Sequence, residues 1–134
     1  MVSLLMAALL ASVTSEQIKT DYASAYKESV AQDKPLMVVV GAPWCPACNA
    51  LKQTTIQPMA QTGELDNVSL VLLNRDNDPA LVKQLTKGEK MLPQIIVYRR
   101  TNAGKWEGER LMGYQPKQPV RNLIKKVASR GGQG

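Results

Sequence analysis

The sequence has no histidine and no phenylalanine, and it has only two cysteines among its 134 residues. Without histidine the chain cannot form a Ser-His-Asp triad, a Cys-His nucleophile pair or a histidine metal site. Glycine-rich phosphate loops of the GxGxxG or GxxxxGK[ST] type are also missing. These absences exclude several large enzyme classes and leave thiol chemistry as the activity that the residues support.

The composition also limits the fold of the protein and the kinds of partner that it can bind. Because phenylalanine is absent, Leu, Val, Ile and Met must fill the core with the few Tyr and Trp. The length and the 44% hydrophobic content predict one globular domain. The net charge is +6, but basic residues are scattered and form no dense stripe interleaved with aromatics. Nucleic acid is therefore not an expected partner, and the surface mildly favours acidic ones.

The two cysteines are Cys45 and Cys48, in the motif WCPAC at 44–48. The motif follows the apolar run 36–40 and precedes a stretch compatible with a helix. A helix N-terminus presents unpaired N–H groups and a partial positive charge, and both favour the thiolate that attacks disulfides. Cys45 meets this terminus first, so we expect it to attack, while Cys48 resolves the mixed disulfide.

Three other interpretations of the cysteine pair are a zinc half-site, a structural disulfide and two inert thiols. Zinc normally needs four ligands, and the chain offers no histidine and no third cysteine. A structural disulfide at this spacing closes a very short loop and adds little stability. We therefore expect a redox-active pair, with no metal and no cofactor beyond the dithiol.

Periodicity predicts an α/β fold with the element order α-β-α-β-α-β-β-α. Pro58 is expected to kink or end the second helix. The pattern implies a four-stranded mixed sheet with helices on both faces and a leading N-terminal helix. The expected helices cover 21–31, 46–57, 76–86 and 119–129, and the expected strands cover 36–40, 68–74, 94–99 and 105–112.

The N-terminal segment 1–15 carries no charge and is mostly apolar. It is too short for a transmembrane helix, which needs about 20 residues, but it suits the apolar region of a signal peptide. We divide the chain into a signal peptide at 1–15, a domain at 16–130 and a flexible tail at 131–134. Export, to a periplasm, is expected. The alternative is a buried or amphipathic N-terminal helix on a cytoplasmic protein, since Met1-Val2-Ser3 lacks the usual basic residue.

Three features together resemble the thioredoxin superfamily over about residues 20–129. They are WCPAC at a strand-to-helix turn, Leu92-Pro93-Gln94 opening the third strand, and Gly113 after the last strand. The chain is most similar to exported thioredoxin-like proteins such as the C-terminal domain of the transmembrane thiol-reductant transporter, which has a leading helix instead of an extra first strand. The resemblance implies a thioredoxin-like fold, with Pro46, Ala47 and Gly113 as supporting residues.

The resemblance also implies roles around the cysteines. The Leu92–Pro93 bond is expected to be cis, so that Leu92 and Pro93 position an extended substrate segment; the alternative is a trans proline that starts an edge strand. Trp44 is expected to shield Cys45 and contact partners, or else to belong to the core.

One position departs from the family. Thioredoxins carry a buried aspartate six residues before the first cysteine, and here that residue is Val39. Proton removal from Cys48 must then use water, the substrate, or a distant carboxylate such as Glu16 or Asp76. No histidine lies between the cysteines to destabilise the disulfide, which favours reduction or exchange over oxidation.

The sequence thus predicts a monomeric thiol:disulfide oxidoreductase that acts on protein thiols and disulfides, with a membrane protein as electron donor or acceptor. Two alternatives stay open. One is a thioredoxin-fold binding module with little redox turnover, and the other is a dedicated reductant for cytochrome maturation.

Overall fold

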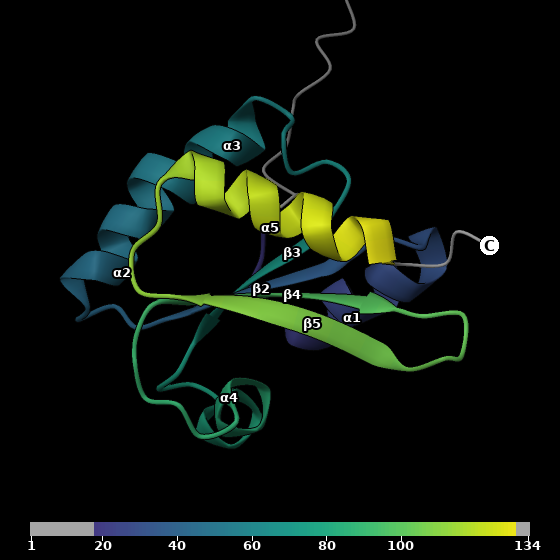
Figure 1. The fold of residues 1–134 in the computed structure, drawn as a ribbon. Helices are drawn as coiled ribbons and strands as arrows, with labels where there is room; N and C mark the ends of the chain where they lie inside the picture. Colours follow the sequence, from purple (N-terminus) through teal and green to yellow (C-terminus); the bar gives the residue numbers. More distant parts are fainter. Residues whose placement is uncertain (1–17, 131–134) are drawn as a thin grey trace, which may run out of the picture.

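The computed structural model describes residues 18–130, which form one mixed sheet covered by helices on both faces (Figure 1). The sheet has five strands in the order β1-β3-β2-β4-β5. The strands are β1 (Ile18–Lys19), β2 (Leu36–Gly41), β3 (Ser69–Asn74), β4 (Gln94–Arg100) and β5 (Trp106–Met112). The helices are α1 (Tyr22–Gln32), α2 (Pro46–Leu51), η1 (Lys52–Ile56), α3 (Gln57–Gln61), α4 (Pro79–Thr86) and α5 (Lys117–Arg130).

The predicted α/β order is confirmed, with one correction to the sheet. Strands β1, β3 and β2 are parallel, and β4 and β5 run antiparallel to their neighbours. The sequence predicted four strands and a leading helix alone, whereas the short strand β1 precedes α1 and pairs with β3. Two residues are too few to show an alternating pattern, so only the pairing of Ile18 with Leu70 and of Lys19 with Val71 reveals this strand.

Alternation along β2 divides the core between the two faces of the sheet. Met37 and Val39 face the cluster under α2, η1, α3 and α5. Leu36, Val38 and Val40 face α1 and α4 on the other side of the sheet. A strand that is buried on both faces reads as a continuous apolar run, as the sequence predicted. The buried side chains of the larger cluster are Met37, Val39, Leu51, Ile56, Met59, Ala60, Leu65, Val68, Leu70, Ile95, Val97, Val120, Leu123 and Val127. As expected without phenylalanine, this core is aliphatic.

The helix after the cysteines does not end at Pro58. Proline has no N–H and its ring collides with the carbonyl of the preceding turn. The chain accommodates it by widening into the π-helical segment η1, in which the Gln57 N–H donates to the Lys52 carbonyl five residues back. The helix then continues as α3 to Gln61, four residues beyond the predicted end at 57. Pro58 therefore reshapes this helix upstream of itself.

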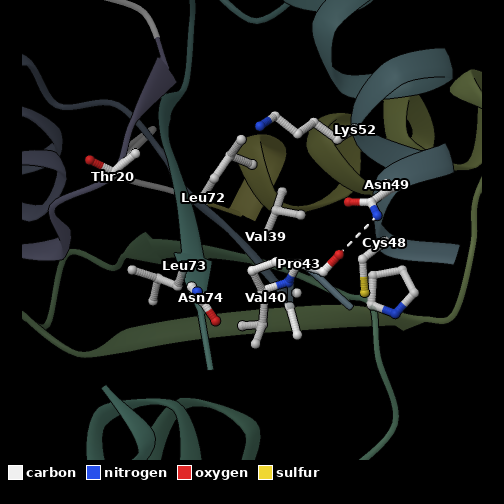
Figure 2. Close-up of a pocket in the computed structure, with 13 residues that line it drawn as sticks. Thr20, Val39, Val40, Pro43, Cys48, Asn49, Lys52, Leu72, Leu73 and Asn74 are labelled. Atoms are coloured by element: carbon white, nitrogen blue, oxygen red, sulfur yellow. Dashed lines mark hydrogen bonds between the residues drawn. The ribbon is translucent and has the colours of Figure 1, made fainter. Parts of the chain in front are cut away.

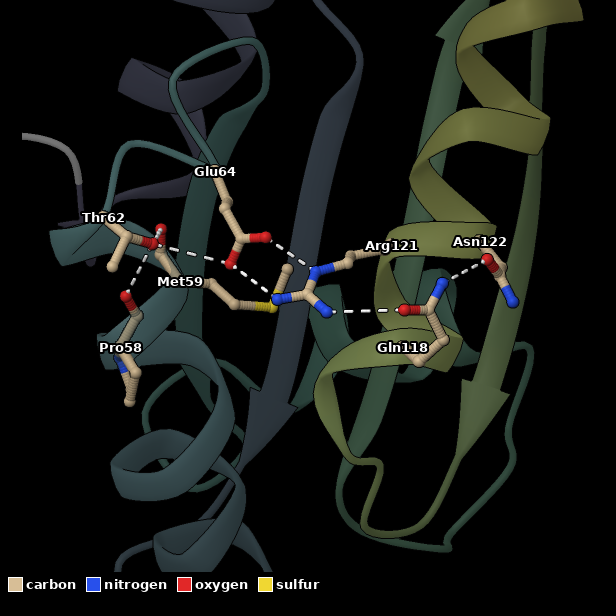
Figure 3. A network of polar contacts seen from close by, with 7 residues as sticks. All are labelled: Pro58, Met59, Thr62, Glu64, Gln118, Arg121 and Asn122. Carbon is tan, nitrogen blue, oxygen red and sulfur yellow. Dashed lines mark hydrogen bonds and ion pairs between the residues drawn. The ribbon is translucent and has the colours of Figure 1, made fainter.

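An ion pair between Arg121 and Glu64 connects helix α5 to the turn after α3 (Figure 3). Arg121 Nε donates to Glu64 Oε1 over 2.6 Å, and a second guanidinium nitrogen donates to Glu64 Oε2 over 3.2 Å. Gln118 accepts a third, longer hydrogen bond from Arg121. The hydrogen bond from Arg121 is the main cause that lowers the pKa of Glu64 below its ordinary value of 4.5.

Glu64→Gln is expected to reduce the stability of the fold in a pH-dependent way. Because the folded-state pKa of Glu64 is lowered, the ion pair stabilises the protein above about pH 4.5 and this contribution fades as the pH falls through the folded-state pKa. Thermal unfolding of wild type and variant should differ slightly at neutral pH and converge in acid. If the melting temperatures of wild type and Glu64→Gln differ by the same amount at neutral pH and in acid, the ion pair with Arg121 is not the source of the stabilisation.

Two predicted segments, the signal peptide at 1–15 and the tail at 131–134, lie outside the described residues. Within residues 18–130, no helix is long and apolar enough to span a membrane.

Candidate active site

The two cysteines lie where β2 gives way to α2 and are joined as a disulfide, with Cα atoms 5.2 Å apart. Cys45 is the N-cap of α2, and its Sγ accepts the backbone N–H of Cys48 over 3.2 Å. Pro46 occupies the first turn, where a missing N–H costs nothing. The first turn therefore directs a donor and the positive end of the helix at the Cys45 sulfur, which favours its thiolate.

Burial does not distinguish the two sulfurs. Cys45 is 7% exposed and Cys48 is 8% exposed. The two residues differ in their surroundings. Cys48 lines a cavity, and Cys45 does not. Pro46 and Ala47, between them, are exposed to solvent.

The cavity lies at the carboxyl ends of the neighbouring parallel strands β2 and β3 (Figure 2). The helices that follow these strands lie on opposite faces of the sheet, and this is where crevices open in α/β proteins. Its volume is about 340 Å³. The lining residues are Thr20, Val39, Val40, Gly41, Ala42, Pro43, Cys48, Asn49, Lys52, Leu72, Leu73, Asn74 and Pro93.

Gly41 lets the disulfide approach the end of β2. A Cβ at this position would lie 3.2 Å from Cys48 Cβ, which is tighter than most Cβ contacts, and 3.4 Å from Cys48 Sγ. No motif in the sequence marks this glycine. Only the packing of α2 against β2 shows that a side chain here would crowd Cys48.

Leu92 and Pro93 lie beside the cysteines, as the family resemblance implied. The Leu92–Pro93 bond is cis, which confirms that prediction. Leu92 packs against the cluster of Ala42, Cys45 and Cys48, and Pro93 is buried in the cavity wall.

Gly113 is hydrogen-bonded to the loop that carries Pro93. Its N–H donates to the Pro93 carbonyl over 2.7 Å, and its φ of 83° lies in the left-handed region that glycine adopts without strain. The predicted supporting residue is thus in direct contact with the loop that carries Pro93.

Gln94 holds the loop before Pro93 in place. Its side chain is fully buried, and Nε2 donates to the carbonyl oxygens of Glu89 and Met91. Met91 itself is 54% exposed, so the loop presents an apolar side chain to solvent next to the cis bond. Sequence reasoning missed Met91, because a methionine in a loop carries no motif.

Trp44 is a surface residue, so its interpretation as a core tryptophan is wrong. The side chain is 60% exposed. Its Nε1 donates to Asp76 Oδ2 over 2.9 Å, and the Arg75 guanidinium lies 5.0 Å from the ring centroid. These contacts from the loop after β3 hold the ring in place beside the cysteines. Asp76, considered as a distant base for Cys48, is engaged with Trp44 and does not line the cavity.

Val39, which replaces the buried aspartate of thioredoxins, lines the cavity together with Cys48. No Asp or Glu is among the described residues that line this cavity. Glu16, the other carboxylate considered, lies outside the described residues. Within residues 18–130, no group of three His, Cys, Asp or Glu side chains could hold a metal ion.

Comparison with known proteins matches residues 17–99 to a family model described as thioredoxin-like. Thioredoxin from Alicyclobacillus acidocaldarius subsp. acidocaldarius is 28% identical over 102 residues, which are 76% of this chain and 90% of that protein. The solution structure of a thioredoxin from Thermus thermophilus is similar with a TM-score of 0.70 and 19% identity, over 87% of this chain and 89% of that one. The crystal structure of chloroplastic thioredoxin z is similar with a TM-score of 0.65 and 22% identity, over 84% and 96%. The predicted thioredoxin-like fold is therefore confirmed.

Proposed function

Because this chain belongs to the thioredoxin-like family and is a thiol:disulfide oxidoreductase, we propose that it reduces or exchanges the disulfides of exported proteins. The observation that carries the proposal is the Cys45–Cys48 pair at the N-terminus of α2, where the Cys48 N–H points at the Cys45 sulfur. Electrons reside on the dithiol itself, and we propose no further cofactor.

The substrate surface in this proposal consists of Trp44, Met91 and Tyr114. All three are large apolar side chains that are at least 45% exposed, and they come from the three loops around the disulfide. The Tyr114 hydroxyl is also within hydrogen-bond distance of Thr54 Oγ1, 2.9 Å, which ties this loop to the helix after the cysteines. An extended substrate segment would lie over Leu92 and Pro93 between these side chains.

We place the protein outside the cytoplasm as a monomer, supplied with electrons by a membrane protein. The support is the uncharged apolar segment 1–15, which suits a signal peptide. In an oxidising compartment a reductase depends on a dedicated donor. N-terminal sequencing of protein from its native host separates this location from a cytoplasmic one, because cleavage would leave a chain that begins near residue 16.

The reduction potential of the Cys45–Cys48 couple tests the direction of the reaction. The Cys45 thiolate is favoured by a helix terminus without help from histidine, so we expect a reducing couple, nearer to about −270 mV than to about −120 mV. Equilibration with glutathione redox buffers measures it. A potential near about −120 mV would make the protein an oxidant and overturn the proposal that it reduces disulfides.

A binding module with little turnover is the second candidate, because none of the described residues that line the cavity next to Cys48 is a carboxylate that could activate its thiol. Reduction of insulin with an external reductant distinguishes the two. Sustained turnover that disappears in Cys45→Ser supports the oxidoreductase, and single-turnover behaviour supports the binding module.

A further inference from the structure

Lys52 lies one helical turn after Cys48. Its backbone N–H donates to the Cys48 carbonyl, so the helix is continuous between the two residues. Residues four apart on a helix share one face, with Cβ atoms about 5–6 Å apart. Both residues line the same cavity, and Figure 2 shows the Lys52 side chain extending along it past Val39.

Lys52 is the one charged residue among the described residues that line this cavity. The residues that line the cavity with Cys48 and Lys52 are all uncharged. They are Asn49 on the same helix, Thr20 after β1, Val39, Val40 and Gly41 of β2, Ala42 and Pro43 after it, Leu72, Leu73 and Asn74 of β3, and Pro93 before β4. Arg75 and Asp76, in the loop after β3, do not line the cavity and contact Trp44 instead. Lys52 has no ion pair with any described residue, so its ammonium is available to a new negative charge.

We propose that Lys52 is a positioning residue for the resolving step, in which its ammonium stabilises the thiolate of Cys48. This inference rests on the proposed exchange function. In the disulfide form neither sulfur is charged, and the ammonium extends toward the far side of the cavity. Reduction allows a negative charge on Cys48, and the flexible four-carbon stem of the lysine lets the ammonium turn toward it.

The step balances without any further reactant. The Cys48 thiol loses its proton to water, and the thiolate attacks the Cys45 sulfur of the mixed disulfide. The Cys45–Cys48 bond forms while the bond between Cys45 and the substrate breaks, and the substrate sulfur leaves as a thiolate that takes a proton from water. The substrate sulfur is reduced and the protein dithiol is oxidised. A cation beside Cys48 raises the fraction of attacking thiolate, whereas a buried carboxylate would accept the proton instead.

The test is a titration of Cys48 alone, in the Cys45→Ser background, followed by the ultraviolet absorbance of the thiolate. Lys52→Gln should raise the pKa of Cys48 by about one unit, which is about tenfold less thiolate at neutral pH. Lys52→Arg should keep the wild-type value, and Lys52→Glu should raise it further. High salt should narrow the difference between wild type and Lys52→Gln, because the ammonium is exposed to solvent.

The matched control is Lys125→Gln, which removes the same charge from an exposed position on α5. It should leave the Cys48 titration unchanged. An unshifted pKa in Lys52→Gln, or an equal shift in Lys125→Gln, would overturn the proposal. The titration involves no substrate, so it reports on Lys52 whether or not the protein reduces disulfides; failure of the proposed function would appear in the insulin assay instead.

Discussion

Cys48→Ser is expected to accumulate stable mixed disulfides with substrate proteins, whereas Cys45→Ser should form none. The structure gives the two residues nearly equal exposure, so the expectation rests on the Cys45 sulfur capping α2 and accepting the Cys48 N–H. With Cys45 as the activated nucleophile, removing Cys48 leaves its adducts unresolved. Both variants should lose turnover, on the order of a thousandfold or more, because the two residues act as one unit.

Trapping is measured by non-reducing electrophoresis after incubation with a disulfide-bonded substrate such as insulin. The double variant, with both cysteines changed to serine, is the control for noncovalent complexes. Equal trapping by the two single variants would reject the assignment of roles. Trapping by Cys45→Ser alone would reverse it and make Cys48, approached from the cavity, the attacking thiol.

Val39→Asp is expected to speed the resolving step and to destabilise the fold. Val39 and Cys48 line one cavity, so a carboxylate at position 39 has access to the Cys48 thiol and can accept its proton. Val39 is only 7% exposed and belongs to the core, so the substitution should cost about 3 kcal/mol of unfolding free energy. Burial raises the pKa of the new carboxylate, so the loss of stability should be largest at neutral pH and should shrink in acid as the group becomes neutral.

Stopped-flow resolution of a preformed mixed disulfide measures the kinetic effect across pH. In wild type, resolution should be slower at about pH 6 than at about pH 8, because Cys48 must ionise into water without a base. Val39→Asn is the matched control, since it has the size and polarity of the aspartate but cannot accept the proton. If wild type resolves equally fast at both pH values, another group in the chain acts as the base. If Val39→Asn accelerates resolution as much as Val39→Asp, the effect comes from altered packing.

Combining Val39→Asp with Lys52→Gln relates this prediction to the proposal for Lys52. In Figure 2 the lysine side chain passes Val39, so a carboxylate there would pair with the ammonium and hold it away from Cys48. The two substitutions should therefore be non-additive in their effects on stability and on the resolving rate.

The sequence by itself determined the order of the elements from α1 onward and the position of the chemistry. The apolar run of β2 and the caps and periodicity of the helices depend on neighbours in the chain, so they can be read locally. The cysteine pair was equally clear, because the motif places both sulfurs at the first turn of α2 whatever else the fold does. The cis bond before Pro93 was predicted by family resemblance and not by any local pattern.

Only the tertiary structure decided which residues from other segments meet the disulfide. Strand β1 forms because β3 offers it a partner, and Gly41 allows close packing because Cys48 lies directly over it. Lys52 lines the cavity because the helix that begins at the cysteines packs near the carboxyl ends of β2 and β3. These contacts join different elements of the fold, and no pattern within a single segment encodes them. The chemistry of the cysteines is therefore local, whereas the surroundings that tune it depend on how the helices close over the sheet.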